Sequence, residues 1–298
     1  MRKLIVLGLV GLVAQLVDGG LGMGYGVTSS TLLVMAGMTP LVASASVHFS
    51  ELATNLASGV AHARLQNVDW PVVFRIAGPG AVGAFLGATV LSALATDWAK
   101  PIMAVVLALL GIYIIIRFVV GIRPQLKKQL TSKFLAPLGL FAGFVDATGG
   151  GGWGPVATPA LLSGGRLEPR KVVGSVDTAE FAVSAAASLG FVLGIGASGI
   201  HWGFAIALLV GGLIAAPLAA LLVRIAPAHL LGVAVGGLIV LTNARTLLGS
   251  FDVPNAARIP IYIAILLVTA AALYVAALRA KRRTAAAPAD VALEAANA

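Results

Sequence analysis

The chain has 298 residues, of which 59% are hydrophobic and only 10% are charged, and it carries a formal net charge of +9. Because soluble domains carry about 25% charged residues, this composition excludes a water-soluble domain and predicts an integral membrane protein. The absence of cysteine excludes disulfide bonds, thiol catalysis and cysteine-ligated metals.

Apolar segments follow one another along almost the whole chain. They lie at 4–17, 27–38, 43–61, 72–95, 101–120, 134–145, 155–163, 172–197, 203–224, 228–248 and 259–278. A basic stretch with Arg123, Lys127, Lys128 and Lys133 divides them into two groups. The regions that we expect are a first transmembrane repeat at 1–120, a basic cytoplasmic linker at 121–133, a second transmembrane repeat at 134–250, a final transmembrane helix at 258–279, and a disordered cytoplasmic tail at 280–298.

The same glycine-rich motif occurs once in each repeat. Residues 17–26 read VDGGLGMGYG, and residues 145–154 read VDATGGGGWG. Each copy sets an aspartate before glycines, then an aromatic residue and a further glycine. A glycine run breaks a helix, and broken backbone at membrane depth is tolerated only where it is buried in protein or lines a cavity. Paired breaks in two halves of a membrane protein therefore predict a substrate site.

The two halves align beyond the glycines, which makes the restart an internal repeat. The first motif aligns with the second at an offset of 128 residues, and one inserted residue makes the offset 129 in the next segment. The aligned pairs are Asp18 with Asp146, Gly22 with Gly150, Gly24 with Gly152, Tyr25 with Trp153, Gly26 with Gly154, His48 with Asp177, Glu51 with Glu180, and Asn55 with Ser184.

The positive charges indicate the topology. Segments 4–17, 27–38, 134–145 and 155–163 are shorter than the roughly 20 residues of a crossing, so each pair forms either one broken crossing or a re-entrant hairpin. Re-entrant hairpins place nearly every basic cluster on one side, as the positive-inside rule requires. We therefore expect an all-α polytopic helical bundle with two inverted-topology repeats, each starting with a glycine-broken re-entrant helix pair, plus one extra C-terminal transmembrane helix. The predicted location is the cell inner (plasma) membrane, with the linker and C-terminus cytoplasmic.

Half-helices that start just after the glycines, near Thr28 and Thr158, would point free N–H groups at the membrane centre, where they suit an anion. The substrate-binding candidates are Gly22, Gly24, Tyr25, Gly26, Thr28, Ser29, Asn55, Gly150, Gly151, Gly152, Trp153, Gly154, Thr158 and Ser184. The alternative is that these glycines only allow close helix packing. That packing role is the one we expect for Gly83, Gly87, Gly232 and Gly236.

Ionisable residues inside apolar spans are costly and by default functional. The candidates for coupling to protons are Asp18, His48, Glu51, Asp146, Asp177 and Glu180. His48, Glu51 and Asn55 share one helix face, and histidine titrates near neutral pH. The alternatives are that the two aspartates cap the half-helices and that the others meet interfacial water near helix ends.

Enzyme and cofactor signatures do not emerge from the sequence. There is no Walker A motif for ATP, and the four histidines form no cluster with metal-ligand spacing. We therefore expect neither an enzyme, nor a cofactor, nor a bound metal.

The glycine-broken segments, each followed by a small-residue segment, a proline and a polar helix face, resemble the TauE/SafE family of sulfite exporters, also called TSUP. The resemblance covers roughly residues 4–275, and the second copy, with Gly149–Gly152, Trp153, Gly154 and Pro155, is closer to the family pattern. Leu21 and Met23 interrupt the glycines of the first copy. The resemblance implies transport of sulfite, organosulfonates or related small anions across the bacterial inner membrane.

We therefore expect a secondary-active exporter of sulfite or a small organosulfonate, with proton coupling. The alternatives are a passive anion channel, a transporter of another small anion such as a carboxylate and, more remotely, a membrane enzyme. The expected partners are the small anionic substrate, the lipid bilayer and a homo-oligomer, and no nucleic acid.

Overall fold

Helices make up most of the described part of the chain, and no strand occurs in it. The computed structural model describes residues 2–21, 23–94, 96–120, 130–163, 167, 169–225 and 228–296. The elements are α1 (Arg2–Leu21), α2 (Tyr25–Met35), α3 (Pro40–Arg64), α4 (Trp70–Ala93), α5 (Thr96–Val120), α6 (Ser132–Gly149), α7 (Trp153–Ser163), α8 (Pro169–Ile195), a 3₁₀ turn (Ala197–Gly199), α9 (Trp202–Ile225), α10 (Ala228–Ser250) and α11 (Asn255–Ala296). The predicted all-α membrane fold is confirmed.

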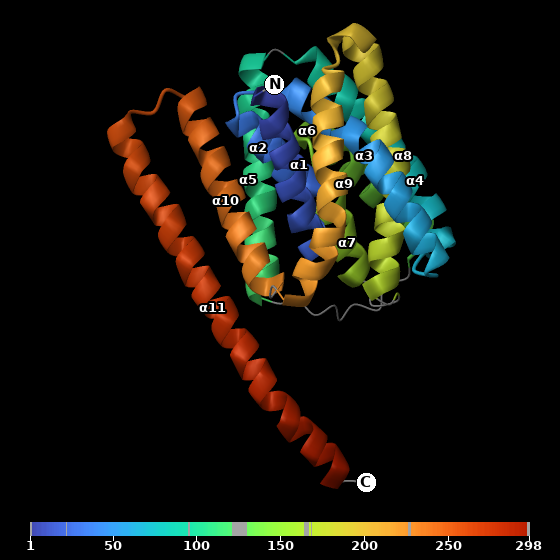
Figure 1. Cartoon of the computed structure of the whole chain (residues 1–298), viewed down its shortest axis with the longest axis vertical. Helices are drawn as coiled ribbons and strands as arrows, with labels where there is room; N and C mark the ends of the chain where they lie inside the picture. The colour runs from blue at the N-terminus through green and yellow to red at the C-terminus, as the bar shows by residue number, and fades with distance from the viewer. Residues whose placement is uncertain are drawn as a thin grey trace.

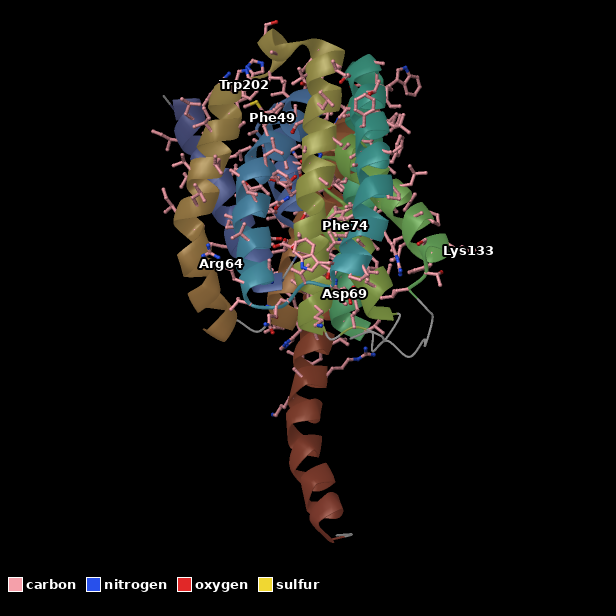
Figure 2. All side chains as sticks on the ribbon, turned by 90° about the vertical axis from the view of Figure 1, so that its right-hand side faces the viewer. Phe49, Arg64, Asp69, Phe74, Lys133 and Trp202 are labelled. Carbon is pink, nitrogen blue, oxygen red and sulfur yellow. The ribbon has the colours of Figure 1, made fainter. Side chains whose placement is uncertain are left out.

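Most of the helices stand side by side and run roughly parallel or antiparallel, so the bundle has two ends, and α11 extends obliquely beyond it (Figure 1). We call the end where α1 and α9 begin the upper end and the opposite end the lower end (Figure 1). Trp202 lies at the upper end, whereas Arg64, Asp69 and Lys133 lie at the lower end (Figure 2). The last turns of α11 also lie on the lower side (Figure 1). Arg64 and Lys133, which the positive-inside argument places on one side of the membrane, thus lie at the same end of the molecule.

The two short helix pairs enter the bundle from opposite ends. Helix α1 begins beside Gly203, at the start of α9, and the end of α2 borders the same upper cavity as Lys100 and Ser250. The first pair therefore returns to the upper end. Helix α6 begins near Leu130, whose carbonyl accepts a hydrogen bond from Arg75 in the first turns of α4, and α7 leads to α8, which begins at the lower end beside Asn67.

Glycines allow the first helix of each pair to pack closely on a long helix of the other repeat. A Cβ atom at Gly11 of α1 or Gly211 of α9 would overlap the backbone of the facing helix, and the same holds for Gly83 of α4 and Gly143 of α6. The packing role predicted for Gly83, Gly87, Gly232 and Gly236 is confirmed, because an added Cβ at each would come within 3.0 Å of a neighbouring helix.

Five of the described helices are long and apolar enough to cross a membrane, namely 70–93, 98–120, 171–195, 232–250 and 255–281. Two further crossings predicted at 43–61 and 203–224 correspond to α3 and α9, with 25 and 24 residues. Helix α3 falls outside the five because it carries the polar face with His48, Glu51 and Asn55.

Helix α11 continues to Ala296 and so covers most of the stretch predicted as a tail at 280–298. The physical reason is composition, because alanine has the highest helix propensity and dominates this stretch. Residues 121–129 of the predicted linker lie outside the described residues.

Candidate functional site

The two aspartates before the glycine runs cap the two half-helices in the same way. The Tyr25 N–H donates to the Asp18 carboxylate at 3.2 Å, and the Trp153 N–H donates to the Asp146 carboxylate at 3.0 Å. The half-helices therefore start at the aromatic residues, three to five positions before the predicted starts near Thr28 and Thr158. That prediction was wrong because the aspartate satisfies the first free N–H group and so fixes the start of the helix.

The glycine runs of the two repeats touch at the centre of the bundle. A Cβ atom at Gly26 would lie 2.7 Å from the Gly151 Cα and 3.2 Å from the Glu51 carboxylate. On the opposite side, a Cβ atom at Gly154 would lie 3.2 Å from the Met23 Cβ. Gly151 also has a φ of +152° and Gly24 a φ of +112°, which are conformations that side chains rarely adopt. Glycine at these positions serves close approach and chain reversal together.

The aromatic residue after each break packs against a glycine of the other repeat. Trp153 is fully buried, donates its indole N–H to the Val176 carbonyl at 2.9 Å and lies so close to Gly80 that a Cβ there would be 2.7 Å from the ring. Tyr25 lies beside Gly212 and its hydroxyl is 3.2 Å from that of Ser50. The tryptophan thus anchors its half-helix and has no free polar group for a substrate.

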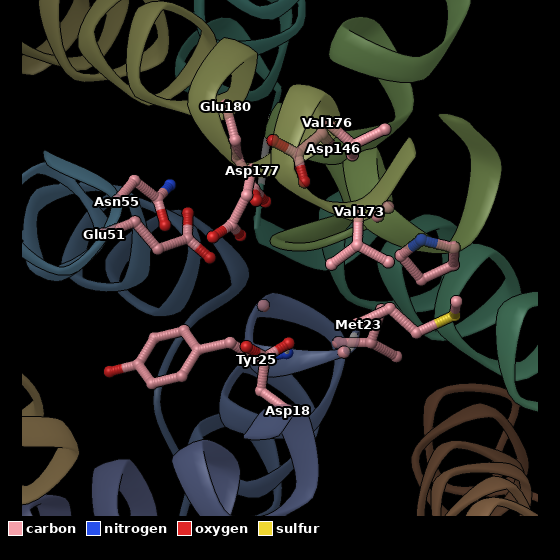
Figure 3. Close-up of a pocket in the computed structure, with 16 residues that line it drawn as sticks. Asp18, Met23, Tyr25, Glu51, Asn55, Asp146, Val173, Val176, Asp177 and Glu180 are labelled. Carbon is pink, nitrogen blue, oxygen red and sulfur yellow. Dashed lines mark hydrogen bonds between the residues drawn. The ribbon is translucent and has the colours of Figure 1, made fainter. Parts of the chain in front are cut away.

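Between the glycine breaks lies a small central cavity of about 30 Å³, room for one or two water molecules. Its predicted lining residues are Asp18, Gly24, Tyr25, Gly26, Glu51, Asn55, Asp146, Gly152, Gly154, Asp177 and Glu180, and those that the sequence reasoning missed are Met23, Val27, Pro155, Val173 and Val176. Carboxyl groups from α1, α3, α6 and α8 surround the space (Figure 3). A single apolar residue carries no chemical signal, so only alignment with a motif position would have pointed to these five.

Helices α3 and α8 meet along their polar faces. The Asn55 amide donates to the Ser184 hydroxyl at 3.4 Å, and that hydroxyl donates to the Glu51 carboxylate at 3.3 Å. Nearer the lower end, the Ser58 hydroxyl donates to the Asp177 carboxylate, with His62 at 3.6 Å. The predicted polar faces therefore meet across the interface of the two repeats in two separate groups of polar contacts.

His48 stands behind the cavity wall and joins the two repeats. Its Nδ1 atom lies 3.1 Å from Glu51 Oε2 and 3.8 Å from Asp146 Oδ2. The ring is fully buried and stacks on Phe191 at 6.0 Å. Asp146 Oδ2 has no hydrogen-bond partner among the described residues. A proton on Nδ1 would thus sit between the cavity carboxylate Glu51 and the carboxylate that caps α7.

Other predicted substrate ligands lie near the cavity without lining it. The Ser29 hydroxyl donates to the Tyr25 carbonyl at 2.6 Å, and the Gly150 carbonyl accepts from Ser30. The hydroxyls of Thr28 and Thr158 are buried and lack a hydrogen-bond partner in the described structure. Gly151, Trp153 and Ser184 support lining residues, and Gly22 lies outside the described residues.

The electrostatic balance of the cavity is acidic. Five of the eleven Asp and Glu residues of the chain line it, and within the described part of the chain no Lys or Arg side chain does. Each half-helix start supplies a partial charge of about +0.5, which its capping aspartate already offsets. An ionised carboxylate 4 Å from an anion would oppose it by about 4 kcal/mol at an effective dielectric constant of 20. The cavity can therefore hold an anion only while most of its carboxyl groups are protonated.

Two comparisons identify the family. The model of the sulfite exporter TauE/SafE family matches residues 7–246. A relative from Bacillus subtilis (strain 168), named "Probable membrane transporter protein YtnM", is 52% identical over 268 residues, which cover 89% of each chain. No solved structure matches the chain. The chain belongs to the TauE/SafE sulfite exporter family of membrane transporters.

Proposed function

We propose that the protein is a secondary-active transporter that carries sulfite or a small organosulfonate, together with protons, across the cell inner membrane. The observation that carries this proposal is the central cavity, where two glycine breaks meet five carboxyl groups. The family supports the substrate class, and the acidic lining supports the coupling to protons. The basic linker and the C-terminus then face the cytoplasm.

Protons and anion depend on one another in this mechanism. Protonation of the carboxyl groups removes the negative charges that would repel the substrate, and the bound anion in turn stabilises the protonated lining. His48 contacts Glu51 and Asp146, so it is placed to pass a proton between these two carboxyl groups of the cavity. The coupling is reciprocal, because proton binding and anion binding each raise the affinity for the other by the same factor.

The enclosed cavity corresponds to a closed stage of the transport cycle. A volume of about 30 Å³ has to widen before a sulfonate can enter. Since α2 and α7 approach from opposite ends, movement of one half-helix would open the cavity to one side at a time. Such alternation is the requirement for secondary transport.

Proteoliposomes that contain the purified protein test this proposal. An imposed pH gradient should accelerate sulfite flux through the wild type, and Glu51→Gln and Glu180→Gln should lose most of that acceleration because their side chains cannot bind the proton. Asp69→Asn is the matched control, because Asp69 caps α4 through the Val72 N–H and lies at the lower end. Flux that ignores the pH gradient in the wild type would favour the passive channel instead.

The same five carboxyl groups favour a second candidate, a carrier of a small organic cation, if they remain ionised. In that case sulfite and sulfonates would not compete with transport, whereas cations would. A flux screen with sulfite, sulfonates, sulfate, thiosulfate, carboxylates and small organic cations separates the two candidates.

A further inference from the structure

A second and larger cavity opens at the upper end of the bundle. Its volume is about 470 Å³, and it lies between the end of α2, the first turns of α5 and the last turns of α10. We call it the upper vestibule, defined by Gly37, Lys100, Arg245, Thr246 and Ser250. It is not part of the central cavity, and the two share no lining residue.

The upper vestibule has the opposite charge to the central cavity. Lys100 and Arg245 line it, and among the described lining residues there is no carboxylate. Both side chains are exposed, and neither has an ion-pair partner in the described part of the chain. An ammonium and a guanidinium group offer eight N–H donors and no acceptor, a combination suited to an oxyanion.

The remaining polar groups of the vestibule already have partners. The hydroxyls of Thr242, Thr246 and Ser250 each donate to the carbonyl one turn earlier in α10. The last carbonyls of α2 accept hydrogen bonds from the N–H groups of Ala36 and Gly37. Among the described lining side chains of the vestibule, the unpaired hydrogen-bond donors are therefore the cationic groups of Lys100 and Arg245.

Helix α2 connects the vestibule with the central cavity. Its first residue, Tyr25, lines the central cavity and its last residue, Met35, lines the vestibule. Eleven residues correspond to about 16 Å of helix. Midway, the Asn243 amide of α10 donates to the Thr31 hydroxyl at 3.1 Å. A movement of α2 would thus change the lining of both cavities.

We infer that the upper vestibule is a binding site for small oxyanions, in which Lys100 and Arg245 hold a sulfonate-like or sulfite-like group on its way into or out of the central cavity. The inference rests on the proposed function for the identity of the transported anion, but the binding site itself is inferred from the charge of its lining side chains. A cationic binding site explains how an anion reaches a high local concentration near the central cavity, whose own carboxylates repel it. A phosphate headgroup of an anionic lipid has the same chemistry and is a rival occupant.

The absence of native cysteine permits a test that does not depend on transport. Ser250→Cys places a thiol in the vestibule, where an anionic ethylsulfonate methanethiosulfonate and a cationic trimethylammonium methanethiosulfonate compete to modify it. We expect the anionic reagent to react about tenfold faster, relative to its rate with a free thiol, because the local potential concentrates it. Addition of Lys100→Gln and Arg245→Gln should abolish this preference.

The matched control is Ser250→Cys with Lys3→Gln, which removes a positive charge from the same end outside the vestibule and should keep the preference. The inference would be overturned if the preference for the anionic reagent persists after Lys100→Gln and Arg245→Gln, or if Lys3→Gln abolishes it as well. A thiol at position 250 that neither reagent modifies would also overturn it. Protection of the thiol by sulfite in vesicles of phosphatidylcholine supports a soluble anion. Protection that requires phosphatidylglycerol assigns the site to lipid and overturns the transport role. If the preference is present but sulfite flux is absent, the proposed function fails while the site stands.

Discussion

At the scale of single residues, the two capping aspartates carry a structural and a chemical role in one side chain. Asp18 and Asp146 each hold the start of a half-helix and each line the central cavity. Protonation of such a carboxyl group leaves a carbonyl oxygen that can still accept the N–H bond but removes the charge. The helix start would therefore survive the change of charge that the proposed coupling to protons requires.

We predict that Asp146→Asn and Asp146→Ala separate these roles. The asparagine oxygen can accept the Trp153 N–H, so Asp146→Asn should keep the stability of the wild type, whereas Asp146→Ala should lose about 1 kcal/mol. Both should lose coupled flux because neither can bind a proton. Thermal unfolding in detergent and flux in proteoliposomes measure the two effects. If Asp146→Asn transports at the wild-type rate with full coupling, Asp146 is a cap and nothing more.

The chemistry of the site could be predicted from the sequence where it depends on residue type and on the spacing of the residues. The pairing of Glu51 with Glu180, and of Asp18 with Asp146, leads correctly to one cavity. The orientation of Trp153 was not readable, because an indole can face a cavity or a helix and only the position of Gly80 decides between them. His48 likewise lies behind the wall of the cavity, at a depth that helix periodicity does not specify.

At the scale of the elements, small residues determine which helices meet. Helix α4 packs on α6 through glycines whose Cβ positions fall on the backbone of the partner. Without a hydrophobic effect between helices in lipid, this close packing stabilises the contact. The sequence predicted the packing glycines correctly and the boundaries of most helices closely. It missed the half-helix starts, since those depend on a hydrogen bond over seven residues.

We expect Gly83→Ala to destabilise the protein by about 1–3 kcal/mol, because its methyl group would overlap the Leu140 carbonyl. Gly78→Ala is the matched control on the same helix, since nothing lies within 4 Å of its Cβ position. Alanine there should change the stability much less than Gly83→Ala does, because its gain in helix propensity is opposed by the crowding of its Cβ against the ring of Pro79. Thermal unfolding of the two variants side by side gives the comparison. Equal unfolding temperatures would contradict the packing that we describe for α4 and α6.

At the scale of the whole molecule, equivalent contacts recur across the interface of the two repeats. Asn55 contacts its own equivalent, Ser184. The contact of His48 with Phe191 corresponds to that of Asp177 with His62, as the offset of 129 requires. Pairs of this kind support a pseudo-two-fold axis between α3 and α8, and with it the predicted inverted repeat. The sequence could suggest that axis through alignment, but not its position.

The two halves of the site are nevertheless unequal. Met23 stands where the second repeat has Gly151, and the cap of α7 faces a histidine where the symmetry-related position holds Asp177. The interruption of the first glycine run was visible in the sequence. Its consequence, a methionine side chain in the cavity wall that accepts a hydrogen bond from Arg117, required the structure. The two capping aspartates therefore have different ionisable neighbours, His48 for Asp146 and Asp177 for Asp18.

The most direct test of the account is whether a substrate gradient moves protons. An aliphatic sulfonate stays an anion across the working pH range, so any proton movement has to pass through the protein. In proteoliposomes without a pH gradient, a sulfonate gradient directed inward should carry protons inward with the sulfonate. The internal pH recorded by a trapped dye should therefore fall. Protein-free vesicles and the Glu51→Gln variant should show no change. Sulfonate flux through the wild type at constant internal pH would contradict proton-coupled transport through the acidic cavity.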